Sequence, residues 1–183
     1  MVILIPGTHG NLEPYAARQW WSQTSPNAAM LRRAGHRVVS FPWSTRLDGL
    51  LSKNSTWLSA GKRLFDTAPE GAHIIAHSHG GAVVAYAAAH GARFGTVVTL
   101  GTPPRSDVPY RELTASCSRW VHIAGDYRDM WAVLGSAGDG IFNWFRRDMP
   151  HAHKNTRWRC NHTELCEVET WDRNKLIEIF YME

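Results

Sequence analysis

The sequence predicts an α/β fold, in which helices cover both faces of a mostly parallel sheet of about six strands. Short, mostly apolar runs recur along the chain, as expected of strands buried on both faces of a sheet. These runs are closed by Gly, Pro or Ser, and segments with helical patterns lie between them. Such alternation over the whole length indicates βαβ units and a parallel sheet.

The apolar runs define the expected strands in chain order. The first is Val2–Ile5, which ends at Pro6-Gly7. The others are 37–41, 72–76, 96–100 and 120–124, with 156–159 as a weaker sixth candidate.

The helices are expected between these strands. Ser25 is a suitable N-cap and Pro26 a suitable first residue for a helix through Arg33 that stops at Gly35. Further helices are expected over 54–67, 79–90 and 171–181.

Size and composition favour one α/β domain over residues 1–183. The chain has 183 residues, and 44% are hydrophobic, which is enough to fill a single core. Residues 130–157 form a long, irregular, aromatic-rich stretch, which we interpret as an insert or partial lid.

Charge and cysteine content narrow the class of protein. The net charge is +4, but the basic residues are scattered, which argues against a nucleic-acid partner. We find no signal peptide and no apolar stretch near 20 residues, so we expect a cytoplasmic protein without stable membrane insertion. Cys117, Cys160 and Cys166 are expected to be thiols, with a bridge between Cys160 and Cys166 as the alternative.

The segment Ala-His-Ser-His-Gly at 76–80 lies between an expected strand and an expected helix. It fits the small-x-Ser-x-Gly pattern of a nucleophile elbow, in which the serine backbone is strained and the residues two positions away must be small. Ala76 and Gly80 meet that demand. Ser78 is therefore a candidate nucleophile, although a serine at this position could instead be a simple N-cap.

From these residues the chain resembles the α/β-hydrolase family, and most closely its small lidless bacterial lipases. Residues 5–10, Ile-Pro-Gly-Thr-His-Gly, are similar to the family's His-Gly-x loop after the first strand, although Pro6 stands where relatives often have His. The resemblance implies that Thr8 and His79 donate backbone N–H groups to an oxyanion. Residues 100–103, Leu-Gly-Thr-Pro, resemble a structural turn beside the site.

In this fold the triad order is serine, acid, histidine. Asp126 and Asp129 both follow the strand expected over 120–124. We favour Asp129, since the family pattern places the acid just before an apolar run, while Asp126 is suited to capping the turn. His162, after the last expected strand, is the expected base.

The function expected from this pattern is ester hydrolysis by a serine esterase or lipase through an acyl-enzyme. The substrate would be a small-molecule or lipid-like ester, with Trp131 in its pocket, and the reaction requires no metal or organic cofactor. A thioesterase, amidase or cell-wall esterase would use the same triad. A non-enzymatic binding protein on this fold is a more distant alternative. The oligomeric state does not follow from the sequence.

A metal-dependent enzyme that uses His151, His153 and His162 is the remaining alternative. His77 and His79 flank Ser78, but side chains two residues apart across a turn rarely converge on a metal. His151 and His153 compete with His162 for the role of base, but they precede the last expected strand and are more simply surface loop residues.

Overall fold

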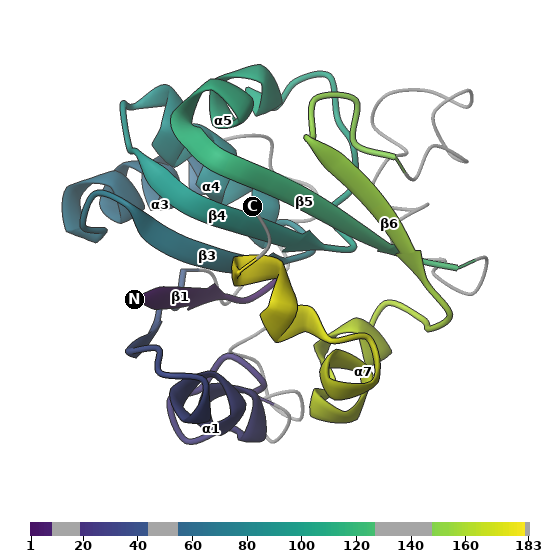
Figure 1. Cartoon of the computed structure of the whole chain (residues 1–183). Helices are drawn as coiled ribbons and strands as arrows, with labels where there is room; N and C mark the ends of the chain where they lie inside the picture. Colours follow the sequence, from purple (N-terminus) through teal and green to yellow (C-terminus); the bar gives the residue numbers. More distant parts are fainter. Residues whose placement is uncertain (9–18, 44–54, 127–147, 182–183) are drawn as a thin grey trace.

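The sheet is formed by six parallel strands in the order β2-β1-β3-β4-β5-β6 (Figure 1). The structure is a computed structural model and describes residues 1–8, 19–43, 55–126 and 148–181. The strands are β1 (Val2–Ile5), β2 (Val38–Ser40), β3 (Ala72–His77), β4 (Phe94–Leu100), β5 (Cys117–Gly125) and β6 (Lys154–Trp158). The parallel sheet expected from the apolar runs is confirmed.

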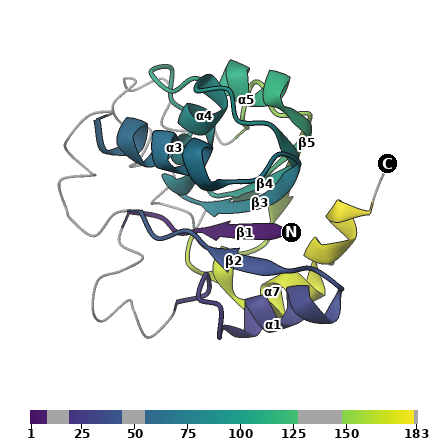
Figure 2. The same ribbon diagram turned by 90° about the vertical axis from the view of Figure 1, so that its left-hand side faces the viewer.

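Helices cover both faces of this sheet (Figure 2). On one face lie α3 (Ser55–Thr67), α4 (Gly80–Ala89) and α5 (Tyr110–Ser116). On the other lie α1 (Pro26–Arg33) and α7 (Val168–Arg173), with the 3-10 helices η4 (Glu164–Cys166) and η5 (Leu176–Phe180) in the same C-terminal segment. Each face has its own apolar core, one around Trp57, Leu64 and Trp120 and the other around Leu31, Val121 and Trp171.

The first helix begins as its sequence predicts. The Ser25 side chain accepts a hydrogen bond of 3.1 Å from the backbone N–H of Ala28, and Pro26 is the first helical residue. The chain then turns at Gly35, whose φ of +87° suits glycine.

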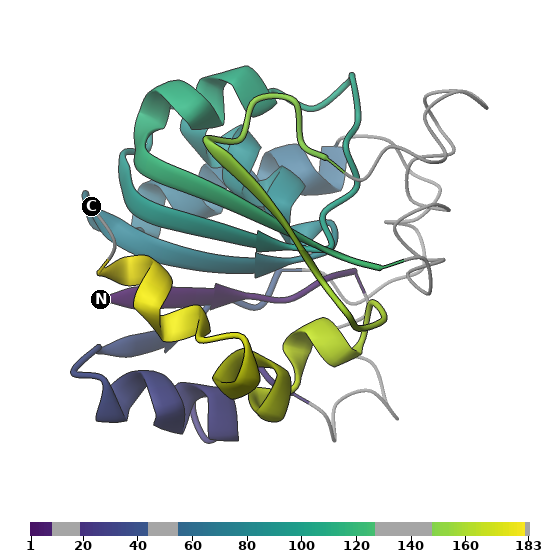
Figure 3. The same ribbon diagram turned by 45° about the vertical axis from the view of Figure 1, so that its right-hand side comes forward.

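The outer strand β6 differs from the expectation over 156–159 by beginning two residues earlier. Four of its five residues are exposed or half-buried, and Trp158 is buried, so an apolar pattern marks only its end. Figure 3 shows β6 along the edge of the sheet, beside β5. The last residues of the stretch interpreted as an insert over 130–157 therefore belong to the sheet.

Two helical segments were not correctly predicted. Helix α5, whose Tyr110 and Leu113 are buried, was missed because it has only seven residues. The helix expected over 171–181 is instead divided into α7 and η5, because Lys175 adopts a left-handed conformation with φ +55°. The Asn174 side chain donates a hydrogen bond of 2.8 Å to the Thr170 carbonyl and helps to end α7.

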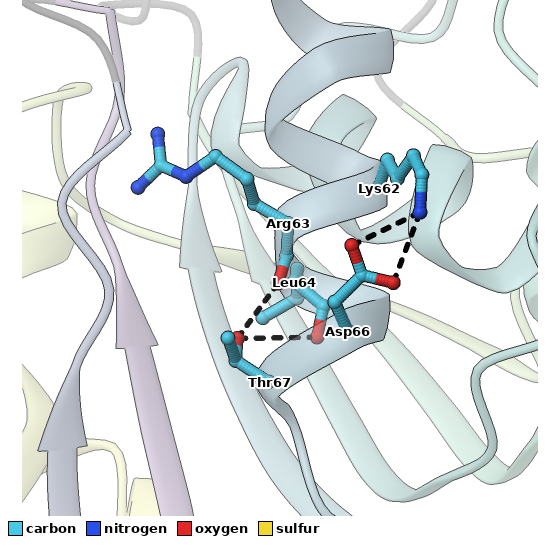
Figure 4. A network of polar contacts seen from close by, with 5 residues as sticks. All are labelled: Lys62, Arg63, Leu64, Asp66 and Thr67. Carbon is cyan, nitrogen blue, oxygen red and sulfur yellow. Dashed lines mark hydrogen bonds and ion pairs between the residues drawn. The ribbon is translucent and has the colours of Figure 1, made fainter.

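The outer face of α3 is charged and solvated (Figure 4). Lys62 and Asp66 form an exposed ion pair of 3.0 Å one helical turn apart, which contributes only about 0.3–0.5 kcal/mol. Thr67 donates to the Arg63 carbonyl at 2.7 Å near the end of the helix. None of the helices in the described residues is long and apolar enough to cross a membrane.

All three cysteines lie in the described parts of the chain and are thiols, so the alternative of a bridge between Cys160 and Cys166 is wrong. Burial raises the pKa of the Cys117 thiol to about 11. Cys117 is therefore protonated, and a poor nucleophile, at neutral pH.

Candidate active site

Ser78 lies in a strained turn between β3 and α4. Its φ is +52°, and among the described residues only Lys175 shares a positive φ without being glycine. This conformation costs about 1–3 kcal/mol and persists only when its surroundings hold it. The Ser78 N–H donates to the Leu100 carbonyl at 2.8 Å, and the Ser78 carbonyl accepts from the Thr102 hydroxyl at 2.8 Å. The exit of β4 therefore fixes both sides of the Ser78 backbone.

Close packing explains the small residues around this turn. A Cβ at Gly80 would lie 2.6 Å from the Pro6 carbonyl oxygen, and a Cβ at Gly81 would overlap the Thr102 side chain. On the opposing loop, a Cβ at Gly7 would lie 2.9 Å from the Cβ of Ser78. The start of α4 thus lies directly against the end of β1. Position 80 therefore requires a small residue, because a side chain there would collide with the backbone after β1.

Thr8 and His79 meet beside Ser78. The Thr8 Oγ1 and the His79 Nδ1 lie 2.7 Å apart in a hydrogen bond, and the two residues are only 5% and 7% exposed. The His79 ring also stacks on Trp57, with ring centroids 4.9 Å apart. Among the described residues, no hydrogen bond from the Thr8 backbone N–H is found. The two residues expected to donate to an oxyanion are therefore linked through their side chains.

His162 follows β6 and is 8% exposed. Its backbone carbonyl accepts a hydrogen bond of 3.0 Å from the His77 Nε2–H, and the two rings lie 4.4 Å apart. A Cβ at Gly101 would lie only 2.8 Å from the His162 Nδ1. The fold thus brings His162 against the residue that precedes Ser78 and against the turn that holds Ser78.

The Ser78 hydroxyl and the His162 ring do not form a hydrogen bond within the described residues. Catalytic hydrogen bonds are often long without a substrate and tighten in the complex. The structure therefore brings the candidate nucleophile and base to neighbouring positions without joining them directly.

Of the two candidate acids of the expected triad, Asp126 lies in the described part of the chain. Asp129, the favoured candidate, lies outside the described residues. Asp126 follows β5 directly, and its N–H donates to the Cys160 carbonyl at 3.1 Å, two residues before His162. Asp126 is therefore on the strand end that joins the His162 loop, so both candidates remain.

Trp131, the expected pocket residue, also lies outside the described residues. Trp43 lies within the described residues, and its Nε1–H donates a hydrogen bond of 2.6 Å to the Pro6 carbonyl, which is a structural role. A groove of about 820 Å³ lies between the end of α4 and residues 104–112, and neither Ser78 nor His162 lines it. We therefore do not assign this groove to the substrate.

The competing histidines lie at the other end of β6. The His153 Nδ1 accepts a hydrogen bond of 2.8 Å from the Trp120 N–H, and the His151 carbonyl accepts one of 2.6 Å from Thr114. The five residues of β6, a length of roughly 16 Å, lie between them and the loop of His162, and the described residues hold no group of three or more His, Cys, Asp or Glu side chains that could bind a metal. His151, His153 and His162 therefore do not share one site.

Sequence reasoning missed two roles at the site. His77 was considered only as a possible metal ligand, whereas its ring contacts His162. Gly101 was given only a structural role in a turn, whereas its missing side chain makes room for the His162 ring. The position of Gly101 directly after an apolar strand was a usable signal, but the contact partner cannot be read from local sequence.

Comparison with known proteins supports the fold. No family model and no curated protein matches the chain. Among solved structures, one match is the alpha/beta hydrolase domain-containing protein 10 from mouse, with a TM-score of 0.52 over 97% of this chain and 89% of that one. The chain has the α/β-hydrolase fold. Sequence identity to the mouse protein is 12%, so the likeness concerns architecture and not chemistry.

Proposed function

We propose that the protein is a serine hydrolase that cleaves carboxylic esters, with Ser78 as the nucleophile. The observation that carries the proposal is the left-handed backbone of Ser78 at a strand-turn-helix junction, because strain of this kind in a non-glycine residue is a mark of functional sites. Thr8 follows the carboxyl end of the neighbouring strand β1, His79 is the residue after Ser78, and His162 contacts the junction through His77. Ligands of α/β sheets bind at such carboxyl ends.

In the proposed reaction, His162 removes the proton of the Ser78 hydroxyl as the oxygen attacks the ester carbonyl. The carbonyl oxygen becomes an oxyanion, which the backbone N–H groups of Thr8 and His79 stabilise by about 2.7–4 kcal/mol each. The alcohol leaves with the proton from His162, and the acyl group stays on Ser78. Water, activated by the same imidazole, then releases the acid.

A carboxylate is needed to orient His162 and to stabilise its imidazolium. Asp129 is our first candidate, and Asp126 is the second because its backbone is bonded to the His162 loop. Replacing each by Asn distinguishes them. The variant that lacks the true acid should have a kcat about 10⁴-fold lower than the wild type, whereas the kcat of the other variant should stay close to the wild-type value.

A fluorophosphonate probe followed by peptide mapping tests the proposal directly. We expect the adduct on Ser78, no adduct in Ser78→Ala and full labelling in Ser118→Ala, which removes an exposed hydroxyl. On p-nitrophenyl esters, Ser78→Ala should lose about 10⁵-fold or more in kcat. A folded wild-type protein that is not labelled on Ser78 would refute the proposed function.

A further inference from the structure

His77 connects the candidate nucleophile to the candidate base. It is the last residue of β3 and directly precedes Ser78. A carbonyl oxygen only accepts hydrogen bonds, so the 3.0 Å contact with the His162 carbonyl requires a hydrogen on the His77 Nε2. The two rings lie 4.4 Å apart and are tilted by 48°. One side chain therefore contacts both the main chain and the ring of His162.

The His77 ring is itself held in place from two sides. A Cβ at Gly7 would lie 3.2 Å from the His77 Nδ1, so the loop after β1 closes one side. The edge of Trp20 lies on another side, with ring centroids 6.3 Å apart. Trp20 in turn packs against Trp171 of α7 at 5.6 Å. The ring thus has little freedom to leave the His162 carbonyl.

The segment that carries His162 is held at its other end by α7. The Trp171 Nε1–H donates to the Leu165 carbonyl at 2.7 Å. Before His162, the Asp126 N–H donates to the Cys160 carbonyl, and after it the Asn27 side chain donates to the Cys166 carbonyl at 3.1 Å. Among these contacts, the one from His77 is made at His162 itself, by the residue next to Ser78 in the chain.

From this geometry we propose that His77 is a positioning residue, which sets the distance between His162 and Ser78 by holding the His162 main chain. The inference rests on the proposed function of the same site. A misplacement of about 1 Å between reacting groups can cost about 10²-fold in rate, so a single hydrogen bond at this point has a large effect on turnover. His79, on the other side of Ser78, is bonded to Thr8, so the two flanking histidines serve different partners.

Two substitutions separate the hydrogen bond from the shape of the ring. His77→Gln places an amide N–H near the Nε2 position and keeps the donor, whereas His77→Phe keeps a ring and removes the donor. His90→Phe, at an exposed histidine at the end of α4, is the matched control. We measure kcat and KM on a p-nitrophenyl ester and the rate of fluorophosphonate labelling.

We expect His77→Phe to lose about 10- to 100-fold in kcat while KM changes less than about threefold, because attack geometry is lost and not binding. His77→Gln should stay within about threefold of the wild type, and His90→Phe should be unchanged. If His77→Phe does not fold, His77→Asn replaces it, since the shorter amide of asparagine cannot reach the His162 carbonyl. The same 10- to 100-fold loss in kcat is expected for His77→Asn.

An NMR readout keeps the inference separate from the proposed function. In protein labelled with ¹⁵N-histidine, the ring signals of His162 should shift in His77→Phe and return toward their wild-type positions in His77→Gln. Absence of Ser78 labelling in the wild type refutes the proposed function and leaves this positioning test in place. The inference is overturned if His77→Phe retains wild-type kcat, or if His77→Gln loses as much as His77→Phe.

Discussion

Gly101 offers the sharpest test of the site, because adding one methyl group there affects His162 directly. In Gly101→Ala the new Cβ would lie 2.8 Å from the His162 Nδ1 and 3.0 Å from its Cε1. This is roughly 0.7 Å short of an ordinary contact of about 3.5 Å. Two of the three nearest atoms belong to the proposed base, and the third is the Leu165 Cδ1 at 3.0 Å.

Two separate costs follow from this change. The φ of Gly101 is +57°, where a side chain costs about 1–2 kcal/mol, so the melting temperature should fall by about 2–8 °C in a chain of this size. Displacement of the His162 ring should lower kcat by about 10- to 100-fold, since a 1 Å misplacement costs about 10²-fold. The first cost comes from the backbone and the second from the contact.

Gly35→Ala is the matched control, because Gly35 has φ +87° and nothing within 4 Å of the position that a Cβ would take. It should lose thermal stability through the backbone cost alone, and so less than Gly101→Ala, and it should keep wild-type kcat. Calorimetry and steady-state kinetics on a p-nitrophenyl ester measure both effects. If folded Gly101→Ala turns over as fast as Gly35→Ala, the contact with His162 has no catalytic importance and the reasoning is refuted.

Three further outcomes are expected. Thr8→Val removes the hydroxyl that is hydrogen-bonded to the His79 Nδ1, a contact worth about 0.5–1.5 kcal/mol, and should lower kcat. Thr8→Ser keeps the hydroxyl and should keep kcat near the wild-type value, and equal kcat in both variants would contradict this. In thermal melting, Ser25→Ala should lower the free energy of unfolding by about 1 kcal/mol, whereas Ser25→Thr should lower it less, because threonine keeps a hydroxyl that accepts from the Ala28 N–H and donates to the Trp20 carbonyl. Burial and the nearby amino terminus lower the pKa of His73, whose Nδ1 accepts the Thr96 N–H at 3.0 Å. The unfolded chain therefore takes up the proton first, so melting temperature should fall as the pH drops below about 6.5, and less steeply in His73→Asn, which keeps an acceptor and does not titrate.

The fold was predictable because burial on both faces leaves a clear pattern in the sequence. Strands β1, β3 and β4 are mostly buried, and each appears in the sequence as a short, mostly apolar run. Strand β6 lies at the edge and is mostly polar, and it was the weaker candidate. The strands were predicted better than their first residues, since β4 and β6 begin two residues and β5 three residues before the expected positions.

The candidate site was only partly predictable. The elbow at Ser78 has a local pattern, since its strain and the demand for small neighbours act within five residues. The contacts of His77 and Gly101 with His162 join residues more than 60 positions apart, and no local spacing encodes them. The choice between Asp126 and Asp129 likewise depends on tertiary geometry and remains a prediction.

The exit of β4, Leu100-Gly101-Thr102, has a consequence for engineering. Leu100 and Thr102 hold the Ser78 backbone, and Gly101 admits the His162 ring, so three consecutive residues contact both the nucleophile segment and the base. Transplanting the reactive pair into another parallel sheet would therefore require the neighbouring strand's exit turn as part of the graft.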